Sequence, residues 1–149
     1  MNPLATTTPR DGIDRASQHS PTSTIKNVSE LAGRALLAVL FLLSGVGKLS
    51  AYAATAAYMS SVGMPAWLLP LVIATEILGA IAIVLGWQTR VAALLLAGYS
   101  LLAALIFHNN FADQIEMIMF LKNVSIAGGF LLLVANGAGR LSLDRRLSK

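Results

Sequence analysis

The stretch WLLPLVIATEILGAIAIVLGWQTRVAALLLAGYSLLAALIFH, residues 67–108, decides the fold class. It consists of two apolar runs joined by the polar pentapeptide GWQTR at 86–90. Each run has about 20 residues, the length that an α-helix needs to cross a hydrocarbon core of about 30 Å. The stretch therefore predicts two transmembrane helices with a tight connection between them.

Two further apolar runs lie outward of this stretch, at 29–49 and 117–136. The chain is 56% hydrophobic and 12% charged, whereas a soluble domain carries about 25% charged residues. The sequence therefore predicts an all-α, integral membrane four-helix bundle over 28–139, with helices near 29–49, 67–86, 90–108 and 117–136. The motif AYA at 51–53 resembles a signal-peptide cleavage site, but the run before it is too long for a signal peptide.

The segments outside the bundle differ in composition from the helices. Residues 1–27 are rich in Ser, Thr and Pro and contain few bulky apolar side chains. Such a segment cannot bury a core, so we expect a disordered tail. Residues 140–149 are predicted to form a basic tail that lies on an anionic membrane leaflet.

Lysine and arginine residues gather on one side of the expected bundle. Nine of them lie in the N-terminal region, the 86–90 connection and the C-terminal tail, and only Lys48 and Lys122 lie toward the other side. The positive-inside rule therefore predicts that both termini are cytoplasmic. The uncharged connection at 50–66 then faces outward, where its Ala-rich part and the following Gly63 and Pro65 predict a short helix on the membrane surface.

Each predicted helix carries polar residues on a face of small side chains. Small side chains mark helix–helix contacts in membranes because they let backbones approach closely. We therefore expect the polar residues to point into the bundle and away from lipid. They are Arg34 and Lys48 on the first helix, Glu76 on the second, His108 on the third and Lys122 on the fourth.

Glu76 is the strongest single indication of a functional site. It lies about 14 Å from the outer end of its helix, near the membrane midplane, where an acidic group costs about 2.5–3.5 kcal/mol. Glu76 could carry a proton or bind a ligand. It could equally form a structural pair with Lys48, Lys122 or Arg34, and the sequence leaves both readings open.

Lys48, His108, Lys122 and Asn123 are expected to converge on the outer half of the bundle, above Glu76. Lys122 and Asn123 could hold the oxygen of an anionic or quinone-like ligand, and His108 could donate a proton near neutral pH. The structural alternatives are a lysine that extends to the membrane surface and an interfacial histidine. Asp113 and Glu116, in the loop between the last two helices, are expected to be solvated.

The sequence also excludes several classes of function. Without cysteine, the chain cannot form disulfides, cysteine-ligated iron–sulfur clusters or a thiolate nucleophile. His19 and His108 fall on opposite sides of the predicted membrane, so a metal site is not expected. The basic residues follow the ends of the apolar runs, which indicates membrane topology and not a nucleic-acid partner.

Three segments together resemble the DoxX/DoxD-like family of small bacterial inner-membrane proteins. They are GRALLAVLFLLSGVGKL, the region from GMPAWLLP to LIFH, and FLKNVSIAGGFLLLVANGAGRLSLDR. The namesakes of that family are associated with a terminal quinol oxidase and with thiosulfate:quinone oxidoreduction, and other members look like membrane partners of redox-protective complexes. Because this chain lacks cysteine, the sulfur chemistry of the namesakes does not transfer to it.

The resemblance implies an inner-membrane protein that binds a quinone-like or small anionic ligand in a redox context. Lys48, His108, Lys122, Asn123 and Arg34 are the predicted ligand-binding residues, with Glu76 as a proton carrier. The cofactor suggested is a quinone, and the suggested partners besides the lipid bilayer are redox subunits or a second copy of the chain. The alternatives are a non-enzymatic membrane scaffold and a small proton-coupled carrier.

Overall fold

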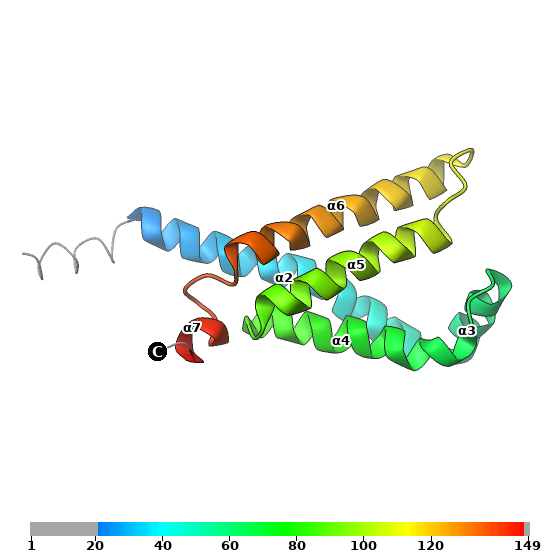
Figure 1. The fold of residues 1–149 in the computed structure, drawn as a ribbon, viewed down its shortest axis with the longest axis horizontal. Coiled ribbons are helices and arrows are strands. Elements are labelled where there is room, and N and C mark those ends of the chain that lie inside the picture. Colours follow the sequence, from blue (N-terminus) through cyan, green and yellow to red (C-terminus); the bar gives the residue numbers. More distant parts are fainter. Residues whose placement is uncertain (1–20, 148–149) are drawn as a thin grey trace, which may run out of the picture.

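The structure, a computed structural model, describes residues 21–147. Within that range it is built from helices that run up and down a single bundle, shown in Figure 1. The four longest are long and apolar enough to cross a membrane, which confirms the predicted all-α four-helix architecture. In chain order the elements are α2 (Pro21–Ser50), α3 (Tyr52–Ser61), η1 (Ala66–Leu68), α4 (Leu69–Leu85), α5 (Thr89–Phe107), α6 (Gln114–Asn136) and α7 (Leu143–Leu147).

Helix α2 begins at Pro21, not near residue 29 as expected from composition. Residues 1–20 of the predicted disordered tail lie outside the described residues, whereas 21–27 are helical. Proline suits a helix start because the first N–H groups have no partner in the helix. Asn27 and Glu30 line a cavity together with the C-terminal loop. The first turns of α2 thus lie beside the C-terminal loop, which is distant in the sequence. Composition alone cannot indicate such a neighbour.

The four long helices associate as two antiparallel pairs. Helix α2 packs along α4 and α5 packs along α6, while the two pairs meet mainly through α4 and α5. In Figure 1 the pairs diverge toward the end that carries α3 and the α5–α6 loop. We call this the α3 end and the opposite one, with the start of α2 and with α7, the terminal end. The shared core consists of Ala38, Phe41, Ala80, Ala82, Ile83, Ala92, Ala93, Leu96, Ala97, Ala127 and Phe130.

The predicted inward faces are confirmed for three helices. Arg34, Glu76 and Ser100 are buried, and Lys48 and His108 are half-buried. The face predicted for α6 is wrong, because Lys122 and Ser125 are exposed and the helix contacts its neighbours through Ala127 and Phe130. Helix α6 is apolar on nearly every side, so small residues gave the wrong rotational phase.

A short turn joins α4 to α5 at the terminal end. Gly86 ends α4 with φ +67°, a conformation that favours glycine. Gln88 also has a positive φ, and its N–H donates to Asp144 Oδ1 at 2.7 Å, while the N–H of Thr89 donates to Asp144 Oδ2 at 2.9 Å. Asp144 belongs to α7, so the C-terminal helix supplies the missing acceptors for the first N–H groups of α5.

Helix α3 is the short helix that the sequence predicted between the first two long helices. It packs against the bundle through Met59, which is buried with Leu69 and Ile73 of α4. Tyr58 of α3 also stacks on Phe107 at the end of α5, with 5.8 Å between the ring centroids. Helix α3 therefore covers one side of the opening between the two helix pairs.

Candidate functional site

Glu76 is the centre of a buried polar network. Its side chain is only 3% exposed and accepts hydrogen bonds from three residues. Lys48 Nζ lies 2.8 Å from Oε1 and 2.9 Å from Oε2, Tyr99 donates its hydroxyl to Oε1 at 2.7 Å, and Ser44 Oγ donates at 3.2 Å. Of the pairings that the sequence left open for Glu76, the structure shows the one with Lys48.

Local sequence and the packing of the helices together place the members of this network. Ser44 lies one helical turn before Lys48 on α2, and Lys48 Nζ also donates to Ser44 Oγ at 2.6 Å. Gly45 lets α2 approach α4 closely, because a Cβ there would lie 2.6 Å from Cγ1 of Ile77 and 3.3 Å from Cβ of Glu76. Tyr99 reaches Glu76 from α5 and packs edge-on against Phe41 of α2, which orients its hydroxyl.

A cavity of about 440 Å³ lies above this network, toward the α3 end. Its floor is polar and includes Ser44, Lys48, Glu76 and Tyr99, while its walls are largely apolar. Some wall residues, including Leu40, Leu71 and Leu102, are also exposed on the outer surface of the bundle. The cavity is therefore an apolar chamber with a charged floor, and it extends to a surface that faces lipid.

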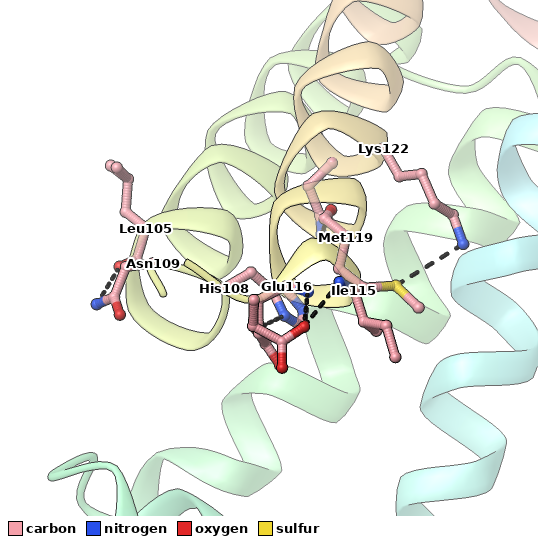
Figure 2. Close-up of polar contacts among 9 residues, drawn as sticks. Leu105, His108, Asn109, Ile115, Glu116, Met119 and Lys122 are labelled. Atoms are coloured by element: carbon pink, nitrogen blue, oxygen red, sulfur yellow. Dashed lines mark hydrogen bonds and ion pairs between the residues drawn. The ribbon is translucent and has the colours of Figure 1, made fainter. Parts of the chain in front are cut away.

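His108 and Asn123 line the same cavity. His108 Nδ1 lies 2.8 Å from Oε2 of Glu116, a pair that joins the end of α5 to the start of α6 and is visible in Figure 2. Asn123 donates its side-chain amide to the carbonyl of Met119 at 3.0 Å. Four of the six predicted site residues, Lys48, Glu76, His108 and Asn123, thus surround one chamber.

Lys122 does not join them. Its side chain is exposed, and its Nζ approaches Met119 Sδ at 3.8 Å. Figure 2 shows this side chain directed away from the His108–Glu116 pair. The prediction that Lys122 converges with the other site residues is therefore wrong. The rotation of α6 about its axis, which also exposes Ser125, turns Lys122 away from the chamber.

Arg34 lies on α2 toward the terminal end of the bundle, far from Glu76 on α4. Its side chain is almost fully buried, and Nη2 donates to the carbonyl of Leu141 in the C-terminal loop. Nε and Nη1 of Arg34 are buried without a hydrogen-bond partner among the described residues. Arg34 is thus inside the molecule, as expected, but it does not belong to the chamber around Glu76.

Sequence reasoning missed three members of the site. Ser44 could have been found from its position one turn before Lys48. Tyr99 gave no such signal, because only the packing of α5 on α2 and α4 brings its hydroxyl to Glu76. Glu116 was expected to be solvated, yet Asp113 caps α6 by accepting from the N–H of Ile115 at 2.7 Å, and the capped first turn presents Glu116 to His108.

Comparison with known proteins places this architecture in a family. The DoxX family profile matches residues 29–109, which contain Ser44, Lys48, Glu76, Tyr99 and His108. The chain belongs to the DoxX family. Inner membrane protein YqjF of Escherichia coli (strain K12) is 46% identical over 125 residues, 84% of this chain and 96% of that protein. Inner membrane protein YphA of the same organism is 42% identical over 123 residues, 78% of this chain and 88% of that protein.

No solved structure matches this DoxX-family chain. The names of the relatives and the four apolar helices together identify it as a multi-pass inner-membrane protein. The buried network lies entirely within the region matched to the DoxX family, whereas Asn123 lies beyond it on α6.

Proposed function

We propose that this protein is a redox-associated component of the inner membrane whose chamber binds a quinone-like, lipid-soluble ligand. The observation that supports it is the chamber itself, with apolar walls over the Lys48–Glu76–Tyr99 floor. Small-molecule sites typically combine apolar walls with a few placed polar groups. Under the proposed topology, with both termini in the cytoplasm, the chamber opens toward the outer face of the membrane.

The polar groups suit a ring that carries carbonyl or hydroxyl oxygens. Tyr99 donates its proton to Glu76, which leaves the phenolic oxygen able to accept from a hydroxyl. The second ring nitrogen of His108 has no partner among the described residues, while Glu116 holds the first. When Nδ1 carries the proton, the other nitrogen can accept one, so the His108–Glu116 pair suits a hydroxylated, reduced ring.

The geometry favours a neutral ligand over a small anion. The three protons of the Lys48 ammonium are directed to Ser44 and to both oxygens of Glu76, so its charge is already compensated. Lys122, the other cation proposed to hold an anion, points elsewhere. The redox partner remains part of the proposal, as a separate subunit or a second copy of the chain.

Ligand-dependent thermal stabilisation tests the proposal. A short-chain benzoquinone at a concentration of about one hundred times its dissociation constant adds about 2.7 kcal/mol to the free energy of unfolding of a protein that binds it only when folded. This raises the melting temperature by about 5 °C or more. Ala103→Phe, which fills the chamber, should abolish this shift. Ala35→Phe adds the same bulk on an exposed face of α2 and should keep it.

A second candidate function has its own support. The carboxylate of Glu76 is fully engaged by Lys48, Tyr99 and Ser44, as expected of a lock between helices in a non-enzymatic membrane scaffold. If the protein is a scaffold, the quinone should not shift the melting temperature of the unmodified protein. The quinone should also not shift the melting temperature of either phenylalanine variant. That result would reject the ligand site and leave the scaffold.

A further inference from the structure

A second cavity, of about 690 Å³, lies at the terminal end of the bundle. It is formed by the first turns of α2, the α4–α5 turn, the end of α6 and the loop that leads to α7. Helix α2 is about 45 Å long at 1.5 Å per residue, which exceeds a hydrocarbon core of about 30 Å. Lys48 lies in the last turn of α2, at the α3 end, so the part of the helix that exceeds the hydrocarbon core lies at the terminal end. We therefore place this cavity at the level of the lipid headgroups.

The lining of this cavity has more basic than acidic residues. Its charged residues are Lys26, Arg90, Arg140 and Arg145 against Glu30 and Asp144. The carboxylate of Asp144 is already occupied by the N–H groups of Gln88 and Thr89. Glu30 and Asp144 together balance two of these four positive charges, and Oε1 of Glu30 lies 3.9 Å from Lys26 Nζ.

Two of the arginines are available for a ligand. Arg90 Nη2 donates to the carbonyl of Ala135 at a long 3.4 Å, and Arg140 makes no hydrogen bond or ion pair with another described residue. A guanidinium presents parallel N–H donors that match the oxygens of a phosphate. Arg140 therefore offers all its donors to a ligand, and Arg90 offers those that remain beside its long hydrogen bond to Ala135.

A buried positive charge lies behind the cavity wall. A Cβ at Gly86 would collide with Nη1 of Arg34 and with Ser142, and Ser142 lines the cavity. Two nitrogens of Arg34, Nε and Nη1, have no hydrogen-bond partner among the described residues, so its charge is incompletely compensated by hydrogen bonds. Glu30 and Asp144 interact with this charge, but the lining has two more basic than acidic residues, and an anion that enters the cavity is attracted by that excess.

We propose that the terminal-end cavity is a binding site for a phosphate group, held by Arg90 and Arg140, with an anionic phospholipid headgroup or free phosphate as its source. The headgroup depth, the positive excess and the available guanidinium donors support the same ligand chemistry. The site is separate from the chamber around Glu76 and does not depend on the function proposed there.

Lipid titration of the purified full-length protein, followed by native mass spectrometry, tests the proposal. The probes are phosphatidylglycerol and phosphatidylcholine with identical acyl chains, and inorganic phosphate is titrated separately by calorimetry at constant ionic strength. Arg90→Gln/Arg140→Gln should weaken binding of phosphatidylglycerol about tenfold or more, the effect of losing hydrogen bonds to a charged group. The control Lys122→Gln/Arg146→Gln removes two charges that do not line the cavity and should leave binding unchanged.

The outcomes separate the two sources. Loss of phosphatidylglycerol binding in the arginine variant, with weak phosphatidylcholine binding throughout, assigns a lipid headgroup. Loss of the heat of binding of inorganic phosphate in the same variant, with unchanged binding of both lipids, assigns free phosphate. Equal affinity for both lipids without a phosphate heat, or an equal loss in the control, overturns the proposal. If the glutamine variant does not fold, Arg90→Lys/Arg140→Lys keeps both charges, and unchanged affinity in it would exclude recognition by the guanidinium groups.

Discussion

At the scale of single residues, the most consequential contact is the ion pair of Lys48 with Glu76. Its carboxylate is shielded from solvent while its ammonium is about one-quarter exposed. A buried charge is tolerated when it is paired and hydrogen-bonded, and becomes strongly unfavourable when its partner is removed. The two residues are therefore energetically coupled, whatever ligand occupies the chamber above them.

Lys48→Met should destabilise the protein by about 3–5 kcal/mol, because it leaves the buried carboxylate of Glu76 without its counter-charge. The double variant Lys48→Met/Glu76→Gln should recover most of that loss, and Tyr99→Phe should cost about 1.5–3 kcal/mol for one hydrogen bond to a charged group. Chemical or thermal unfolding in detergent measures all three. Additive losses in the double variant would show that the pair is not coupled.

Residue-level prediction from the sequence succeeded where a single helix carried the information. Glu76 and Lys48 were identified because a charge within an apolar run is costly, and their faces were set by small neighbours. Lys122 was misplaced because α6 is apolar around its circumference, so periodicity does not define its inner face. Tyr99 could not be predicted, because its role depends on the relative rotation of α5 against α2 and α4.

At the scale of elements, the closest approach in the α2–α4 pair depends on one glycine. Gly45→Ala should lower stability by about 1–3 kcal/mol, because the new methyl group would overlap Ile77 and press on Glu76. Gly47→Ala is the matched control, since a Cβ there meets nothing within 4 Å. It should be neutral or stabilise by up to about 1 kcal/mol through helix propensity. Equal effects in the two variants would contradict close packing at Gly45.

The attachment of α7 to the α4–α5 turn is expected to depend on pH. Burial alone would raise the pKa of Asp144, but hydrogen bonds from Thr89 and Gln88 and the nearby charge of Arg34 lower it below its ordinary value of 3.8. A depressed pKa in the folded state contributes stability above the unfolded-state pKa, and that contribution is lost as the pH falls through the folded-state pKa.

Asp144→Ala should therefore reduce stability by about 1 kcal/mol at neutral pH, as expected for a lost helix cap. The difference from the unmodified protein should stay constant down to about pH 4 and shrink below it. Thermal unfolding of both proteins as a function of pH provides the measurement. A difference that grows on acidification would contradict the capping role.

The element boundaries show what a sequence can and cannot establish. The lengths of the apolar runs located four helices, and the turn at 86–90 followed from its polar composition. The first turns of α2 were assigned to a tail because they carry few apolar residues. Their contacts with the C-terminal loop arise from segments far apart in the chain, and no local pattern indicates them.

At the scale of the whole molecule, the proposed orientation can be tested directly because the chain has no native cysteine. Ser61→Cys on α3 and Arg146→Cys on α7 introduce exposed thiols at opposite ends of the bundle. In spheroplasts, a membrane-impermeant maleimide should label the first at once and the second only after lysis. The reverse pattern would place both termini outside and the chamber opening toward the cytoplasm.

The divergence of the two helix pairs has a consequence for how a ligand would be delivered. Leu40, Leu71 and Leu102 line the chamber and also lie on the surface that meets lipid. A hydrophobic guest would therefore enter by lateral diffusion within the bilayer, without crossing water. Occupancy would then be governed by the guest's mole fraction in the membrane, and adding empty vesicles at a fixed amount of protein and guest should empty the chamber.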